Sequence, residues 1–361
     1  MAKQLRLNFI FDVFGKLFIS GTKAKGVLKI YTMNDVKINK IKIGIVGKIN
    51  IEADENGNPT SFERSFYSSE ENIFDSSDLV ANDSDDEHLV EFGVPLASNL
   101  PTSISLKEGS ITYHLYATME ETFPDGVTQN MNTQASISVV RLIDCNTIPK
   151  ATKEKIANAL PVAGCACLQR QEPNDCLQIS PRAYVPGDCI KINVILFNAL
   201  STPLCYVQVA LVQKVKIKCE DRSVKVQSVV SETKHGSVMP QQVQVWHDEM
   251  LRIPALPPTT CHKHLQITYK LKLIPVKHNA EESTPILEVP VLIGNLPLEA
   301  TLSHLNPLSR NEDPDHMLLP IPSPYKHYAR EENCVQRVGT KFVPSYITYT
   351  TERAMENIEL Q

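Results

Sequence analysis

The chain has 361 residues, which exceeds one ordinary domain and predicts two domains of roughly 150 residues with a tail. A hydrophobic content of 42% is enough to build real cores and excludes general disorder. The formal net charge of -5 disfavours a nucleic-acid binder, because phosphate binding requires clustered positive charge.

The sequence predicts a cytoplasmic chain without a membrane anchor. Residues 1–7 lead into alternation rather than into an apolar run, so we expect no secretory signal. No stretch approaches the ~18 uninterrupted apolar residues of a membrane span. The nine cysteines are odd in number and several lie in apolar strand patterns, so we expect reduced thiols of a cytosolic protein.

In the first half of the chain, apolar residues recur with a period of two. Alternating runs occupy residues 5–11, 41–51 and 111–119. Successive side chains of a strand point to opposite faces, so each run describes one buried and one wet face. Such half-buried strands belong to antiparallel sheets. The segment 69–87 is rich in Ser, Asp, Asn and Glu, and we expect a long acidic loop there.

The second half shows the same pattern in residues 190–196, 207–217 and 265–273. Turn residues separate the runs, and helical periodicity is almost missing. The fold class predicted is therefore all-β, with two tandem antiparallel, immunoglobulin-like sandwiches. One helical hint remains at residues 152–160, where Ile156, Ala159 and Leu160 could share a face and Thr152 could cap the helix.

These patterns give four predicted regions. Residues 1–148 form the N-terminal sandwich, 149–168 a linker, 169–300 the C-terminal sandwich and 301–361 a mostly irregular tail. The tail is predicted because alternation stops near 300 and prolines then interrupt any regular element.

Motifs of the second half resemble the C-terminal domain of arrestins. The order and spacing of four motifs carry this resemblance: Tyr184 followed by Pro186-Gly187-Asp188, a strand closing on Asn198, Trp246 before Ile253-Pro254, and Pro290 to Leu298 with Gly294. The first half is similar to the arrestin N-terminal domain through Leu100-Pro101-Thr102-Ser103 and Gly109-Ser110-Ile111-Thr112-Tyr113. The pattern is closest to the arrestin domain-containing, or α-arrestin, branch.

This resemblance implies a non-enzymatic, cytoplasmic adaptor in membrane-protein trafficking, endocytosis and protein transport. Its implied partners are the tails of membrane-protein cargo, with peripheral association at the plasma membrane or endosomes. An alternative from the same superfamily is a structural subunit of a coat or retrieval complex, like the arrestin-folded subunit of retromer. A sandwich has a packed interior, so either function must lie on loops, faces or edges.

In α-arrestins a Pro-Pro-x-Tyr motif in the tail binds WW domains of ubiquitin ligases, and this tail holds two near matches. Pro322-Ser323-Pro324-Tyr325 has Ser for the second Pro, and Val343-Pro344-Ser345-Tyr346 has Val for the first. The candidate partner-binding residues are Val343, Pro344, Ser345, Tyr346, Pro322, Pro324 and Tyr325. Two other interpretations stay open: ordinary tail turns, or a short strand added to the sandwich by Tyr346, Ile347 and Tyr349.

The sequence predicts no catalysis, cofactor or metal. It contains neither a Gly-x-Ser-x-Gly elbow nor a phosphate-binding Gly-x-x-x-x-Gly-Lys. Cys165, Cys167 and Cys176 could suggest zinc, but a closed site needs four ligands and no fourth is visible. Lys214, Lys216 and Lys218 share one parity of a strand, which either faces solvent or meets acidic lipid headgroups.

Overall fold

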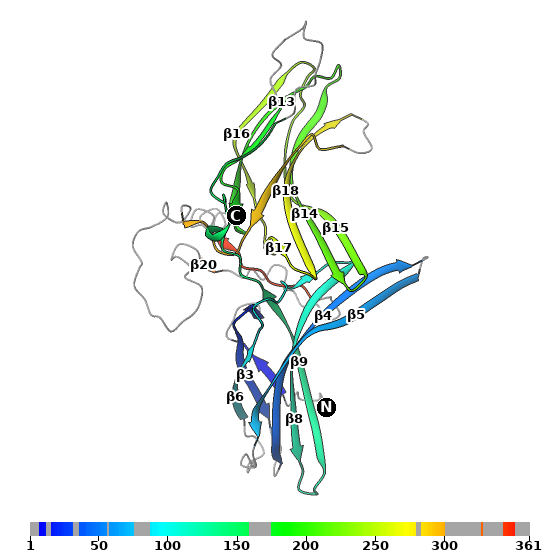
Figure 1. Ribbon diagram of the computed structural model, residues 1–361, viewed down its shortest axis with the longest axis vertical. Helices are drawn as coiled ribbons and strands as arrows, with labels where there is room; N and C mark the ends of the chain where they lie inside the picture. The colour runs from blue at the N-terminus through cyan, green and yellow to red at the C-terminus, as the bar shows by residue number, and fades with distance from the viewer. Residues whose placement is uncertain are drawn as a thin grey trace. The chain divides into compact units, whose positions relative to one another are not determined.

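The computed structural model describes residues 7–11, 16–31, 36–55, 58–75, 87–158, 175–278, 283–299, 326–327 and 342–350. Their regular structure is almost entirely β-strand, arranged in two tandem sheet-rich domains (Figure 1), so the predicted all-β class is confirmed. No helix of the described residues is long and apolar enough to cross a membrane.

The chain divides into two compact units. Unit 1 is Met1–Arg141, Ile217–Val224 and Ala329–Tyr346, and unit 2 is Leu142–Lys216, Lys225–Tyr328 and Ile347–Gln361.

Unit 1 contains a three-stranded and a six-stranded sheet. The three-stranded sheet has the order β1 (Leu7–Ile10), β3 (Lys23–Tyr31), β6 (Glu87–Pro95). The six-stranded sheet has the order β2 (Leu17–Ile19), β9 (Thr128–Val140), β8 (Gly109–Thr122), β4 (Lys37–Glu55), β5 (Asn58–Asp75), with β7 (Ile104–Ser105) also paired to β8. β2 runs parallel to β9, whereas the other recorded pairs of these sheets are antiparallel.

The predicted alternation explains why β4 and β8 form the core of unit 1. On β8 the side chains of one parity are fully buried: Ile111, Tyr113, Leu115, Ala117 and Met119. On β4 the isoleucines of one parity are buried in the same way, and Ile43 and Ile45 lie directly opposite Ala117 and Leu115. Removing one large aliphatic side chain from water contributes roughly 1.5–3 kcal/mol, so this shared face fixes the register.

Unit 2 repeats the plan with a four-stranded and a six-stranded sheet. The four-stranded sheet has the order β10 (Lys155–Asn158), β11 (Cys176–Ile179), β13 (Cys189–Phe197), β16 (Val243–Arg252). The six-stranded sheet has the order β12 (Ala183–Tyr184), β19 (Leu287–Ile293), β18 (Leu265–Lys277), β14 (Leu204–Cys219), β15 (Arg222–His235), with β17 (Thr260–Cys261) also paired to β18. As in unit 1, the short first strand is parallel to its neighbour, here β19.

The two units also share a buried hydrogen bond. In unit 1 the phenol of Tyr113 on β8 donates to the carbonyl of Pro101 at 2.6 Å. In unit 2 the phenol of Tyr269 on β18 donates to the carbonyl of Pro257, also at 2.6 Å. Each tyrosine lies at the centre of its six-stranded sheet, and each proline precedes its tyrosine by 12 residues. The two units are therefore two versions of one architecture.

Two local predictions were wrong. The helical hint at 152–160 fails because residues 155–158 form β10, whose four residues pair antiparallel with β11. A short isolated helix is only marginally stable, whereas pairing with β11 supplies hydrogen-bond partners for the main chain. Residues 155–158 therefore form a strand because of the strand beside them. The acidic loop was expected from residue 69, but β5 continues to Asp75 along β4. Residues 76–86 lie outside the described part of the chain.

Candidate functional site

The tail residues 342–350 form the candidate site, because they contain one of the two predicted docking motifs. Val343 is 48% exposed, whereas Pro344 is buried. Ile347 and Tyr349 are buried, with 1% and 2% of their surface exposed. Residues 322, 324 and 325 of the other predicted motif lie outside the described residues. The segment 342–350 is therefore docked through Pro344, Ile347 and Tyr349, whereas Val343 faces solvent.

Within unit 1, the docked segment contacts β9 and the residues just before β7. The main-chain N–H of Ser345 donates to the hydroxyl oxygen of Ser138 at 2.9 Å. The phenol of Tyr346 donates to the carbonyl of Ser103 at 3.1 Å. Burial raises the pKa of this phenol, so it stays protonated and remains a donor. The predicted docking motif assigns the Tyr346 side chain to a WW domain. In the structure its hydroxyl instead bonds within the chain.

Ser103, which accepts the bond from Tyr346, is fixed by two hydrogen bonds to Val139. Its N–H donates to the carbonyl of Val139 at 2.7 Å, and the N–H of Val139 donates to its side-chain oxygen at 2.8 Å. In unit 2 Thr259 makes the same pair of bonds with Ile293, at 2.7 and 2.9 Å. The acceptor of Tyr346 therefore belongs to the framework common to both units.

Within unit 2, the tail is held by Tyr349. Its main-chain N–H donates to the carbonyl of Pro186 at 2.9 Å, and its phenol donates to the carbonyl of Asn295. A Cβ on Gly187 would overlap the carbonyl oxygen of Tyr349. Gly187 also has a φ of +98°, a region that side-chain-bearing residues rarely adopt. Glycine is thus required both by the turn and by the close approach of the tail.

A short strand forms at the end of the segment. β21 (Tyr349–Thr350) pairs antiparallel with β20 (Lys326–His327), so the interpretation of the tail as a strand added to the sandwich is not confirmed. The partner of β21 is a strand from the tail, not a strand of the sandwich. The preceding residues 342–348 have no regular secondary structure.

The sequence contained the residues that hold Tyr349 but no sign of their role. Pro186, Gly187 and Asn295 were used above only as motifs of a resemblance. Their contribution to tail docking is made through main-chain carbonyls and a missing side chain, which no residue pattern encodes. The usable signal was the apolar spacing of Ile347 and Tyr349.

The carboxyl group of Asp188 follows this glycine. Its Oδ2 accepts a bond from the N–H of Val185 at 3.1 Å. Burial raises the pKa of Asp188 from 3.8 to about 6, because removal from water penalises the charged form, while the bond from Val185 acts in the opposite direction. The neutral carboxyl therefore becomes substantially populated in mildly acidic conditions.

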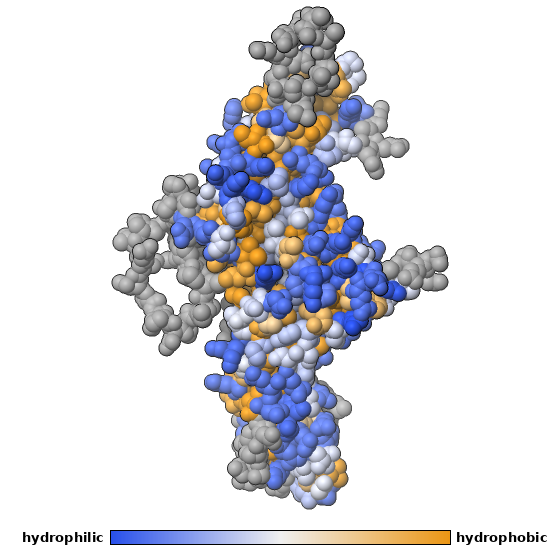
Figure 2. Space-filling model, viewed as in Figure 1, coloured by the Kyte–Doolittle hydropathy of each residue, from blue (hydrophilic) through white to orange (hydrophobic). Residues whose placement is uncertain are grey.

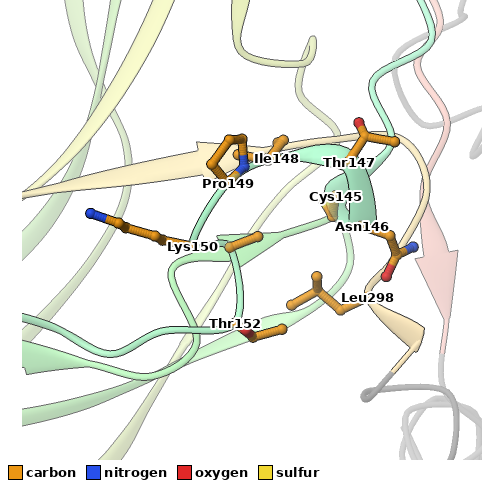
Figure 3. A pocket seen from close by; sticks show the side chains of 9 residues that line it. Cys145, Asn146, Thr147, Ile148, Pro149, Lys150, Thr152 and Leu298 are labelled. Carbon is orange, nitrogen blue, oxygen red and sulfur yellow. The ribbon is translucent and has the colours of Figure 1, made fainter.

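An open hollow of about 350 Å³ lies in unit 2 beside a short 3-10 turn at Cys145–Thr147 (Figure 3). Its polar side chains do not converge, since those of Asn146 and Lys150 point in different directions. The thiol of Cys145 donates weakly to the carbonyl of Tyr184 at 3.6 Å, and burial raises its pKa to about 12. A protonated thiol is a poor nucleophile, so Cys145 is unsuited to nucleophilic catalysis.

The cysteines considered for zinc do not form a described site. Cys165 and Cys167 lie outside the described residues, and Cys176 is a half-buried free thiol on β11. Among the side chains that the structure places, no three His, Cys, Asp or Glu residues gather as metal ligands.

The second half of the chain carries one basic and one apolar surface. Lys214, Lys216 and Lys218 lie on one parity of β14, as predicted. On β13 and β16, Ile195, Val243 and Val245 are exposed, and Figure 2 shows apolar surface over this part of the four-stranded sheet. Ile195 and Val245 lie opposite each other in the ladder, so they form one patch. Contact of the lysine face with a membrane remains a prediction.

Comparison with known families decides the identity of the fold. Residues 7–146 match the family Arrestin (or S-antigen), N-terminal domain, and residues 176–298 match Arrestin (or S-antigen), C-terminal domain. The chain belongs to the arrestin superfamily. Proteins of this family are non-enzymatic adaptors that bind cargo proteins and act in trafficking. The docked tail of this arrestin begins beyond both matched ranges.

Proposed function

We propose that this arrestin is a cytoplasmic adaptor of the α-arrestin branch that connects membrane-protein cargo to a ubiquitin ligase at the plasma membrane or endosomes. The match to both arrestin domains carries the adaptor part of the proposal. The ligase part rests on Pro344 and Tyr346, which keep the Pro-x-Tyr half of the WW-binding motif.

The surroundings of the motif support a switchable docking site. Val343 is exposed, and the hydrogen bonds from Ser345 to Ser138 and from Tyr346 to Ser103 are of ordinary length. Each such bond contributes only about 0.5–1.5 kcal/mol net, so a partner of micromolar affinity can replace them. Undocking is required first, because a WW domain must contact the proline ring and the phenol directly.

A peptide titration tests the ligase part. A peptide of residues 341–354 is titrated against a panel of WW domains from ubiquitin ligases, with Tyr346→Ala as the matched control. Binding in the micromolar range that is lost in the control supports Pro344 and Tyr346 as docking residues. Absence of binding across the panel refutes this role for the segment. The arrestin fold would then act through its sandwiches alone.

A further inference from the structure

The three-stranded sheet of unit 1 carries exposed apolar side chains on its outer face. Buried and more exposed side chains alternate along β1 and β3, and β3 and β6 lie side by side (Figure 1). On the outer face Leu89 is 60% exposed, more than any other large apolar side chain that the structure describes, and Ile10 is 41% exposed. Ile10 lies opposite Val27 in the ladder, and Leu89 lies opposite Lys29. Apolar side chains are therefore gathered on the solvent side of this sheet.

Three lysines of β3 lie on the same face. Lys23, Lys25 and Lys29 share the parity of Val27, and the first two are exposed. A Cβ on Gly93 of β6 would be 3.5 Å from Cδ of Lys23 and 3.8 Å from Cγ of Lys25, so the aliphatic stems of both lysines lie beside this glycine. Lysines whose stems follow a protein surface keep their ammonium groups in water. The apolar side chains therefore have cationic neighbours.

Tyr31 and Glu91 complete this face. The ammonium of Lys29 lies 4.9 Å from the centre of the Tyr31 ring, which is a cation–π contact. Glu91 is exposed and lies opposite Val27. Among the outward side chains of β1, β3 and β6 that the structure describes, three lysines thus stand against one carboxylate, a net charge of +2. The whole chain has a formal net charge of -5, so this face is locally basic on an acidic protein.

The spread of the lysines favours a planar anionic surface as the ligand. Lys23 and Lys29 are six residues apart on an extended strand, which corresponds to about 20 Å. An α-helix with its side chains is only about 10–12 Å across, so a helix that crosses the strands cannot contact both lysines. A bilayer with acidic headgroups contacts all three lysines at once, and its interface also accepts aliphatic and tyrosine side chains.

We propose that the outer face of β1, β3 and β6 docks on an anionic membrane surface. Lys23, Lys25 and Lys29 contact the headgroups, and the side chains of Ile10 and Leu89 enter the interface. This inference rests on the proposed function, in which the arrestin acts at the plasma membrane or endosomes. It assigns the membrane contact to unit 1 and to a surface other than the lysines of β14.

Cosedimentation of the full chain with vesicles tests the proposal. The vesicles contain phosphatidylcholine with about one quarter phosphatidylserine, and pure phosphatidylcholine vesicles are the comparison. The chain should bind the acidic vesicles, and added salt should weaken binding because it screens exposed charges. Each lysine near an anionic surface strengthens binding about fivefold, so the double variant Lys23→Gln, Lys25→Gln should bind about twentyfold more weakly. Glu91→Gln should bind about fivefold more tightly, because it removes a charge that the headgroups repel.

The apolar part of the surface has its own variant. Leu89→Ser should weaken binding to the acidic vesicles several-fold, because it removes an aliphatic side chain from the interface. Val229→Ser on β15 is the matched control, since Val229 is 52% exposed and lies on another strand. The control should bind like the wild-type chain. Equal losses in the two variants overturn the proposal.

A second lysine pair separates this face from net charge alone. The double variant Lys214→Gln, Lys218→Gln removes the same charge from β14. The proposal is overturned if this pair weakens binding as much as the β3 pair, if Glu91→Gln brings no gain, or if the wild-type chain does not bind acidic vesicles. In the last case an acidic protein segment becomes the better candidate for the face. No cargo and no WW domain takes part, so failure here leaves the adaptor and ligase proposals standing, and their failure leaves this measurement intact.

Discussion

The two units of this arrestin are built alike but hold the tail differently. Each has a six-stranded sheet with the same topology and a buried tyrosine bonded to a proline carbonyl. In each, a Ser or Thr hydroxyl also accepts a hydrogen bond from the main chain of the neighbouring strand. In unit 1 the tail touches this shared framework itself, through Tyr346 and Ser103. In unit 2 it bonds instead to the Pro186–Gly187 turn and to Asn295.

The two parts of the tail also differ in how closely the protein encloses them. Tyr349 is 2% exposed and is fixed by a main-chain bond, a phenol bond and the close approach to Gly187. Around Tyr346 the proline is buried, but Val343 remains half exposed. The segment is therefore anchored in unit 2, while unit 1 shields the candidate ligase motif.

The largest effect is expected from Gly187→Ala. The added Cβ overlaps the carbonyl of Tyr349 and also strains a backbone with positive φ, at a cost of about 1–3 kcal/mol. Hydrogen exchange at the amide of Tyr349 should become at least about tenfold faster. Gly126→Ala is the matched control, because Gly126 has a φ of +82° but no neighbour within 4 Å. If the control frees the tail equally, the contact at Gly187 is not the anchor.

The buried tyrosines Tyr113 and Tyr269 allow the stability of the two units to be compared directly. Tyr113→Phe and Tyr269→Phe each leave a buried carbonyl without its donor, which costs about 1–3 kcal/mol of unfolding free energy. Tyr269→Phe should cost more, because the side-chain amide of Gln213 also donates to this hydroxyl at 2.8 Å. Chemical denaturation measures both variants. A larger loss for Tyr113→Phe would contradict the hydrogen-bond account.

The pH dependence of unit 2 depends on Asp188. Its pKa is about 6 in the folded protein against an ordinary value of 3.8, so the folded state binds the proton more tightly. Its contribution to stability is therefore greatest below about pH 4 and declines as pH rises through 6. Asp188→Asn keeps an acceptor for Val185 and should raise stability at pH 7.5 by about 1–3 kcal/mol relative to wild type. This gain should vanish near pH 4. A gain that does not change with pH would show that the carboxyl does not titrate in this range.

The strands and the arrestin architecture were predictable, because alternation and turn residues are local signals. The helix expected at 152–160 failed because residues 155–158 pair with β11, and three apolar residues are too few for a local pattern to reveal such a partner. The spacing of Ile347 and Tyr349 allowed a docked tail as one interpretation, but the acceptors that hold the tail were not predictable. These acceptors are carbonyls of Pro186 and Asn295, and every residue type has a carbonyl.

The smallest effect is expected from Val343→Pro. This change completes the Pro-Pro-x-Tyr motif and pre-orders the polyproline conformation, so a 341–354 peptide should bind its WW domain several-fold more tightly. Val343 is 48% exposed, so the substitution should leave the docked tail in place. Isothermal titration measures the peptide, and hydrogen exchange of the full chain checks docking. An unchanged affinity would show that the segment does not bind in the polyproline mode.

The most direct test compares the isolated tail with the tail in the intact protein. One WW domain is titrated with the 341–354 peptide, with the wild-type chain and with the chain carrying Tyr349→Ala, whose substitution lies outside the candidate motif. We predict micromolar binding of the peptide, binding by the wild-type chain at least about tenfold weaker, and recovery in Tyr349→Ala. Equal affinity of peptide and wild-type chain would contradict the account, because the docked segment would then not restrain the motif at all.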